Sequence, residues 1–238
     1  MPGHVPRRQT CDAAGRAFAG SQKQIQNYIN EQPETLNRAI EDALGCTLGL
    51  RWVSPLKADR YREYKDGQFL DRLGFGKNGQ DLKMFWPRGG PRWDALVCVE
   101  TAGGVLLPQA KSYVSEMYIS GCGATDPASL RMIDGSLAST KAWLGVPSTI
   151  DWRGTFDYHV GEVTRKGFLY QMANRLAHLY FFREVVGIDA WFVNVCFTGD
   201  PHSPTSREEW EAGLAEASSN LGVSAVPFAA DVILPALK

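Results

Sequence analysis

The spacing of apolar residues along the chain predicts mostly helices in its first quarter and an alternation of strands and helices after it. Residues 33–44, for example, place Leu36, Ile40 and Leu44 on one face of a helix that ends at Gly45. Ser206 and Glu209 form the spacing of a capping box, which predicts the start of a late helix. The predicted helices cover residues 21–31, 33–44, 66–73, 128–144, 164–183 and 206–222.

Shorter apolar runs predict the strands. LGLRWVSP at 48–55 reads as a strand that ends at proline, and AWFVNVCF at 190–197 is apolar on both faces, which is typical of the centre of a sheet. Residues 93–113 form a hairpin, and FAADVILPAL at 228–237 adds an edge strand. Residues 57–91 read as irregular apart from one short helix, and the segment before 164 as a loop. We therefore expect an α/β fold with a central mixed β-sheet flanked by helices.

No internal repeat and no long linker divides the chain. Its 238 residues, 44% of them hydrophobic, suffice for one sizeable core. We expect a flexible N-terminus over residues 1–20, which are rich in Gly, Ala, Pro and Arg, and a single domain over residues 21–238.

Composition excludes several classes of protein. The five cysteines are scattered without a C-x-x-C pair, so neither a zinc finger nor a disulfide scaffold is indicated. No apolar stretch is long enough for a membrane span and no signal core is present, so we expect a cytoplasmic protein without a membrane partner. The net charge is −1, but residues 57–92 carry nine basic against five acidic side chains. That excess fits either a surface for an anionic ligand or an ordinary solvated face.

Three polar residues stand in the predicted hairpin where buried residues are expected. If the turn is centred on Ala102–Gly103, the numbers of paired residues sum to about 205, and Asp94 faces Lys111 with Gln109 on the same side. An acid and a second oxygen ligand can hold Mg²⁺ or Mn²⁺, while a lysine positions water near a phosphate. This arrangement makes Asp94, Gln109 and Lys111 candidate catalytic residues, with Asp94 and Gln109 as metal ligands.

This hairpin resembles the PD-(D/E)XK, or restriction-endonuclease-like, superfamily, in which an Asp opens one strand and (Asp/Glu)-x-Lys lies on the next. The resemblance extends to a little-characterised bacterial branch and covers most of residues 21–221. The stretches that carry it are SQKQIQNYINEQPETLNRAI, WVSPL, EYKDGQFLDRLG, FWPRGGPRWDAL, AKSYVSEM and YQMANRLAHLYF. It implies a Mg²⁺-dependent nuclease that acts on nucleic-acid phosphodiesters, on DNA more than RNA, and leaves a homodimer open.

The chain departs from this pattern at one position, because Gln109 stands where such relatives carry Glu. An amide oxygen can ligate a cation but removes one negative charge, which weakens metal binding. Three outcomes stay open: a working variant site, rescue by another acid, or a nucleic-acid-binding or protein-interaction module that has lost its chemistry. Glu116 is the first candidate for the additional metal ligand, and Glu34 and Glu41 on the second helix are others, although each fits an ordinary surface residue.

A polar stripe on the predicted helix 164–183 is the other candidate feature. Gln171, Asn174, Arg175 and His178 follow at helical spacing, and we expect the first three to point toward Asp94 and Lys111. The resemblance implies that Gln171 supports the site, whereas an exposed polar face is the alternative. Trp86 and nearby aromatic residues beside arginines fit either base stacking or core packing.

Overall fold

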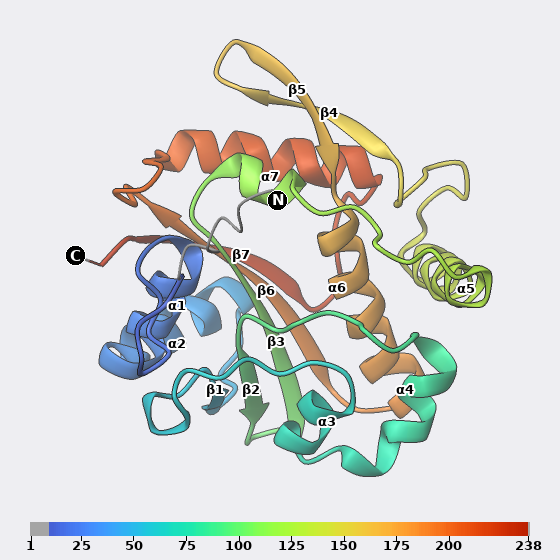
Figure 1. Cartoon of the computed structure of the whole chain (residues 1–238), viewed down its shortest axis with the longest axis horizontal. Helices are drawn as coiled ribbons and strands as arrows, with labels where there is room; N and C mark the ends of the chain where they lie inside the picture. The colour runs from blue at the N-terminus through green and yellow to red at the C-terminus, as the bar shows by residue number, and fades with distance from the viewer. Residues whose placement is uncertain (1–9, 238) are drawn as a thin grey trace, which may run out of the picture.

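A five-stranded mixed sheet forms the centre of the computed structural model, which describes residues 10–237 (Figure 1). The strands follow the order β1-β2-β3-β6-β7, in which β1, β2 and β3 are antiparallel neighbours and β6 and β7 run parallel to β3. They cover Leu50–Ser54, Leu96–Val99, Gly104–Lys111, Ala190–Thr198 and Ala229–Pro235. This confirms the expected α/β fold with a central mixed sheet flanked by helices.

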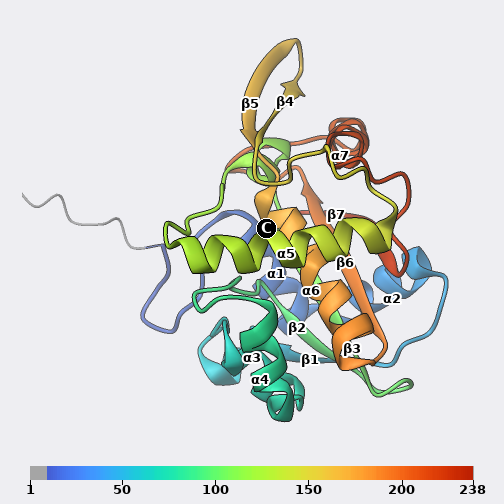
Figure 2. The same cartoon turned by 90° about the vertical axis from the view of Figure 1, so that its right-hand side faces the viewer.

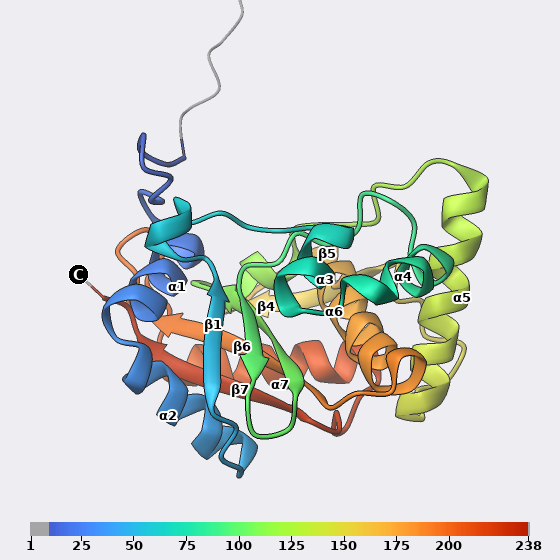
Figure 3. The ribbon, with the colours of Figure 1, turned by 90° about the horizontal axis from the view of Figure 1, so that it is seen from below.

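Helices cover both faces of the sheet, as two views at right angles show (Figures 2 and 3). On one face Ile25 of α1 and Leu36 of α2 pack with Leu106 of β3, and on the other Leu176 of α6 and Trp210 of α7 pack in the core that contains Leu107. The α-helices α1 to α7 span Gly20–Glu31, Pro33–Leu44, Gly67–Leu73, Gly79–Phe85, Pro127–Leu144, Tyr170–Tyr180 and Arg207–Leu221. Among the described residues no helix combines the length and the apolar character needed to cross a bilayer.

Local sequence signals set several of these helix ends. α7 starts with the predicted capping box, because the Ser206 side chain accepts from the Glu209 N–H and the Glu209 side chain accepts from the Ser206 N–H. α2 begins at Pro33 and ends at Gly45, whose φ of 68° is readily adopted only by glycine. A π-helix, Phe181–Val186, continues α6.

The β2–β3 hairpin has a different register from the predicted one. Val97 pairs with Leu106 and Cys98 with Val105, so paired numbers sum to 203, because the turn occupies 100–103 rather than being centred on Ala102–Gly103. Continued toward residue 94, this register places Asp94 opposite Gln109, not Lys111. The shift is an even number of positions, so the predicted sharing of one sheet face is retained.

A second hairpin was not predicted from the sequence. Residues 155–160 and 163–168 form β4, Thr155–Val160, and β5, Val163–Phe168, which pair with each other and project from the body of the molecule (Figure 2). The predicted helix at 164–183 is therefore wrong in its first turns, and α6 begins only at Tyr170. Most side chains of this hairpin are exposed, so burial imposes no clear alternation of apolar and polar residues on its sequence. The helix α4 within the segment predicted as irregular is a further correction.

The N-terminal segment is described from residue 10 onward. Residues 1–9, part of the predicted flexible N-terminus, lie outside the described residues. Of the rest, Cys11 forms a β-bridge with Ala17, and Ala17 is buried with its N–H donated to the Gln26 side chain of α1.

Candidate active site

Asp94, Gln109 and Lys111 lie on the sheet face that α6 covers. Side chains alternate along a strand, and Leu96, Val105 and Leu107 belong to the core on that face. Asp94 is two positions from Leu96, and Gln109 and Lys111 are two and four positions from Leu107. All three side chains therefore point to this face. The Asp94 Oδ2 accepts a hydrogen bond from the Ala110 N–H at 3.1 Å, which ties the acid to β3 beside Gln109 and Lys111.

Gln171 joins the two β3 residues from α6. Its Oε1 accepts from the Lys111 Nζ at 2.7 Å and from the Gln109 Nε2 at 3.2 Å. Lys111 is only 4% exposed, and within residues 10–237 no carboxylate forms an ion pair with it. The amide oxygen of Gln171 is therefore the group that holds a buried ammonium in place. The expected orientation of Gln171 toward this patch is confirmed.

A second carboxylate, Glu63, faces Asp94. Tyr64 and Trp93 form an isolated antiparallel bridge in which the Trp93 N–H donates to the Tyr64 carbonyl oxygen at 3.0 Å. Their neighbours Glu63 and Asp94 are thus the next cross-strand pair, with side chains on the face opposite to those of Tyr64 and Trp93. Gln22 of α1 donates from its Nε2 to the Glu63 Oε1 at 2.9 Å.

The surroundings of Glu63 change its acidity. Burial, and after it the charge of Asp94, raise the pKa of Glu63 to about 7, although Arg92, the Gln22 hydrogen bond and Arg175 act in the opposite direction. Two carboxylates held side by side repel each other, so one of them retains its proton more tightly. The pair therefore presents a place where a cation would relieve the repulsion.

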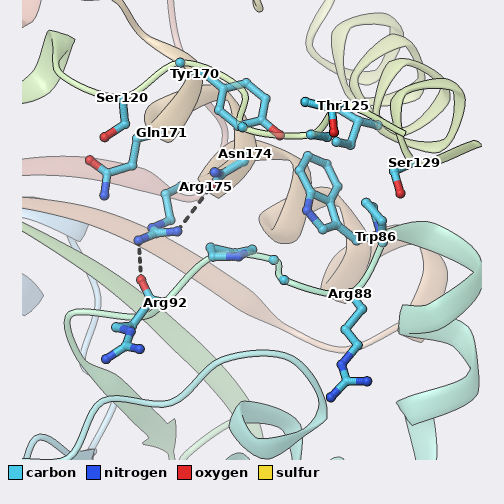
Figure 4. Close-up of a pocket in the computed structure, with 18 of the residues that line it drawn as sticks. Trp86, Arg88, Arg92, Ser120, Thr125, Ser129, Tyr170, Gln171, Asn174 and Arg175 are labelled. Carbon is cyan, nitrogen blue, oxygen red and sulfur yellow. Dashed lines mark hydrogen bonds between the residues drawn. The ribbon is translucent and has the colours of Figure 1, made fainter. Parts of the chain in front are cut away.

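Arg175 lies near this pair and is 1% exposed. Its guanidinium donates to the Asn174 Oδ1 at 3.0 Å and to the Arg92 carbonyl oxygen at 2.6 Å (Figure 4). It also stacks at 4.5 Å on the Trp93 ring. Burial lowers the pKa of Arg175, whereas the charges of Asp94 and Glu63 raise it. Arg175 thus points toward the patch as expected. Two of its N–H donors form hydrogen bonds within the protein, whereas a contact with a phosphate was expected.

Part of this site lines one open cleft of about 750 Å³, called the site cleft here, whose lining does not include Gln109 or Lys111. Its lining includes Glu63, Asp94, Gln171 and Arg175, together with the exposed arginines Arg88 and Arg92. Figure 4 shows the two exposed arginines extending from one segment, with Arg88 well away from Arg175. The cleft thus combines two exposed cations with two half-buried acids, so it offers charges of both signs to a ligand.

Buried polar atoms without a hydrogen-bond partner gather around this site. The described residues contain five such side-chain atoms, and three belong to neighbours in the site: the Gln109 Oε1, the Arg175 Nε and the Trp93 Nε1. Such atoms are costly in a folded protein unless an unseen water, ion or ligand satisfies them. The Gln109 Oε1 is an acceptor, so a cation or a donor is the partner that it lacks.

The other acids considered from the sequence have different surroundings. Both oxygens of Glu116 accept hydrogen bonds, from the Ser21 Oγ at 2.6 Å and from the Ser112 N–H at 2.8 Å. Glu41 caps the N–H groups of Leu48 and Gly49, beside the turn end of the β2–β3 hairpin and away from Asp94. Glu34 is exposed in the first turn of α2.

Two carboxylates and two amides are the oxygen-bearing groups that the site offers to a metal ion. Within residues 10–237 no group of three or more His, Cys, Asp or Glu side chains is placed to hold one. Mg²⁺ needs only one or two carboxylates, since water and phosphate oxygens complete its octahedron. Asp94 and Glu63 supply that number of carboxylates, and the unpartnered Gln109 Oε1 is a neutral oxygen donor of the same site.

Glu63 and Gln22 escaped the sequence analysis. Glu63 opens the stretch EYKDGQFLDRLG, and Gln22 lies in the first stretch that carries the resemblance. Glu63 occurs in a segment without regular alternation, and its partner Asp94 is thirty-one positions away. A single β-bridge joins the two segments, and one isolated bridge leaves no periodic pattern of apolar and polar residues in the sequence.

Comparison of the chain with protein-family models, with curated proteins and with solved structures finds no match.

Proposed function

We propose that this protein is a Mg²⁺- or Mn²⁺-dependent nuclease with a restriction-endonuclease-like core, which hydrolyses phosphodiesters of DNA in preference to RNA. The observation that carries the proposal is the convergence of Asp94, Gln109, Lys111 and Gln171 beside the half-buried Glu63. An antiparallel β2–β3 pair, a parallel β6 and a helix across β3 support the same core.

In this proposal Asp94, Glu63 and Gln109 hold the metal ion. Glu63 supplies the negative charge that Gln109 lacks, and the pKa of Glu63 falls when a cation binds beside it. The chemistry that Mg²⁺ would supply there is polarisation of the phosphodiester and a lower pKa of a coordinated water. Glu116, the additional ligand expected from the sequence, braces Ser21 and Ser112, so Glu63 takes its place in the proposal.

Lys111 and Gln171 act on the phosphate side. Gln171 fixes the ammonium of Lys111 by a hydrogen bond of 2.7 Å, so the positive charge is already oriented before the substrate arrives. Such a preoriented charge stabilises the negative charge that develops on a phosphate during attack by water. Arg88 and Arg92 contact the flanking phosphates, which position a nucleic acid without reading its sequence.

A plasmid-nicking assay with pure protein tests the proposal. The wild-type protein is expected to nick DNA with Mg²⁺ or Mn²⁺ and to stop when EDTA is added. Lys111→Met keeps most of the buried volume and is expected to lower the rate by about 10²–10³-fold. Lys77→Ala, at an exposed lysine outside the cleft, should leave the rate unchanged.

A nucleic-acid-binding module without chemistry is the second candidate, and the contact of Gln109 favours it. Its amide donates to Gln171, so part of the position normally filled by a metal-binding acid serves an internal hydrogen bond. This candidate predicts metal-independent binding of DNA and no nicking with either ion. Nicking that Lys111→Met abolishes excludes it.

A further inference from the structure

A second, more apolar pocket of about 510 Å³ lies next to the site cleft. The two share the segment from Trp86 to Pro91 as a common wall. Phe69, Leu82 and Trp86 supply buried apolar surface, and Lys83 and Arg88 are its exposed cations. We call it the aromatic pocket. Its volume falls in the range of pockets that hold small organic ligands.

His178 is the buried polar group of the aromatic pocket. It is 1% exposed and is surrounded by the rings of Phe69, Phe85, Trp86 and Trp93 at centroid distances of 5.1–6.2 Å. The same helical stripe that sends Gln171, Asn174 and Arg175 to the site cleft sends His178 to this pocket.

The tautomer of His178 follows from its contacts. Burial lowers its pKa to about 3, so the ring is neutral at physiological pH. The Nδ1 lies 2.7 Å from the Asn174 carbonyl oxygen and must donate to it, because a carbonyl oxygen only accepts. The Nε2 therefore carries the lone pair, and no described residue donates to it. The ring thus offers an acceptor to a ligand in an otherwise apolar pocket.

Two hydrogen bonds to Asp66 fix the segment that separates the two pockets. The Asp66 Oδ1 accepts from the Gly89 N–H at 2.8 Å and from the Gly90 N–H at 3.1 Å. Gly89 has a φ of 86°, and a Cβ at Gly90 would come within 3.1 Å of the Trp86 ring. These glycines let the segment turn closely around Trp86, so a phosphate chain in the site cleft and a planar group in the aromatic pocket are separated only by this segment.

We propose that the aromatic pocket binds a nucleobase, with the base lying against Trp86 and Phe69 and donating an N–H to the His178 Nε2. A nucleobase is planar and apolar on its faces and carries N–H donors on its edge, which matches each of these three features. Arg88, which lines both pockets, is placed to contact the phosphate attached to that base. The inference rests on the proposed function for its ligand class, but base binding requires neither a metal ion nor turnover.

Binding of a fluorescent single-stranded oligonucleotide in EDTA tests the proposal. An oligonucleotide with one abasic position in its centre is the matched probe, and AMP as competitor distinguishes a free nucleotide from a base within a chain. If an internal base enters, the abasic probe is expected to bind about 10-fold more weakly, consistent with the contribution of one stacked base. If a free nucleotide is the ligand, AMP binds and the two oligonucleotides bind alike.

Two variants fill part of the pocket without changing His178, so they test base binding even if a change at His178 disturbs folding. Gly67 and Gly79 line the pocket, and a Cβ at either would meet nothing within 4 Å. Gly67→Leu and Gly79→Leu are therefore expected to fold and to remove the difference between the base-bearing and abasic probes. His178→Phe should do the same by removing the acceptor. Gly135→Leu, in open space on α5, is the control.

Lys111→Met separates this inference from the proposed function. It is expected to abolish nicking but to leave the discrimination against the abasic probe unchanged. Equal binding of both oligonucleotides by the wild-type protein, together with no AMP binding, would overturn the nucleobase proposal even if the protein nicks DNA. Discrimination that survives in both leucine variants would also overturn it, because the base must then bind elsewhere.

Discussion

Glu63 and Asp94 form a cross-strand pair of carboxylates next to the single bridge between Tyr64 and Trp93. This isolated bridge joins two segments that do not otherwise pair as strands. Burial of Glu63, and after it the charge of Asp94, raise the pKa of Glu63 to about 7. The protein keeps this unfavourable pair beside a buried lysine and a buried arginine, which is typical of functional sites.

The raised pKa makes stability depend on pH. Folded Glu63 binds its proton more tightly than unfolded Glu63, so its favourable contribution is present below pH 4.5 and is lost as pH rises through about 7. From pH 5 to pH 8 we expect the wild-type protein to lose about 1–3 kcal/mol more unfolding free energy than Glu63→Gln does, after allowance for partial exposure. Urea unfolding in EDTA measures this. Glu34→Gln, at an exposed helix residue, is the control and should track the wild type.

Gln109→Glu is expected to raise affinity for Mn²⁺. A third carboxylate would join Asp94 and Glu63, so the metal-free variant should unfold at a lower temperature while the metal-bound form gains an ionic ligand. Calorimetric titration with Mn²⁺ and thermal unfolding in EDTA measure the two effects. Gln68→Glu, on the exposed side of α3, is the control. Equal Mn²⁺ affinity in the wild type and in Gln109→Glu would show that residue 109 does not ligate the ion.

The sequence predicted the framework of this site better than its details. Period-two alternation placed Asp94, Gln109 and Lys111 on one face, and that conclusion survives an even shift in register. The register itself depended on the turn, and a four-residue turn at 100–103 cannot be distinguished from a shorter one by apolar spacing. Helical spacing likewise predicted that Gln171 faces the patch, because burial of the apolar side of α6 fixes its rotation.

Contacts between distant segments could not be predicted in the same way. Glu63 meets Asp94 through one bridge, and the β4–β5 hairpin is exposed, so neither leaves a periodic pattern. The role of Arg175 was misassigned for a related reason. Helical spacing places its side chain at the cleft, but only the positions of Asn174 and the Arg92 carbonyl show that two of its donors are already engaged.

Removal of the Arg175 side chain is expected to lower stability, whereas removal of the Arg92 side chain is expected to weaken DNA binding. Arg175→Met leaves Asp94 and Glu63 without their buried cation and should destabilise the protein by about 3–5 kcal/mol. Arg92→Ala removes an exposed side chain and should leave stability within about 0.5 kcal/mol. It should instead weaken DNA binding, and the slope of the logarithm of the binding constant against the logarithm of the salt concentration should fall in magnitude by about one. Urea unfolding and fluorescence binding at several salt concentrations measure both. A salt slope that Arg92→Ala leaves unchanged would exclude a phosphate contact at this residue.

Gln171 offers the sharpest test of how Lys111 is held. Gln171→Leu removes the acceptor shared by the Lys111 ammonium and the Gln109 amide, and leaves a buried charge without a partner. We expect a loss of about 1–3 kcal/mol in unfolding free energy, together with loss of any nicking activity. Gln171→Glu keeps an acceptor at the same place and adds an opposite charge, so stability should return toward that of the wild type. Nicking should not return, because the ammonium is then paired with a carboxylate and the added negative charge repels the phosphate. Urea unfolding and plasmid nicking of the two variants separate these effects, with Gln68→Leu as an exposed control. Full stability in Gln171→Leu would mean that the 2.7 Å hydrogen bond does not hold Lys111, and the proposed orientation of its charge would then be wrong.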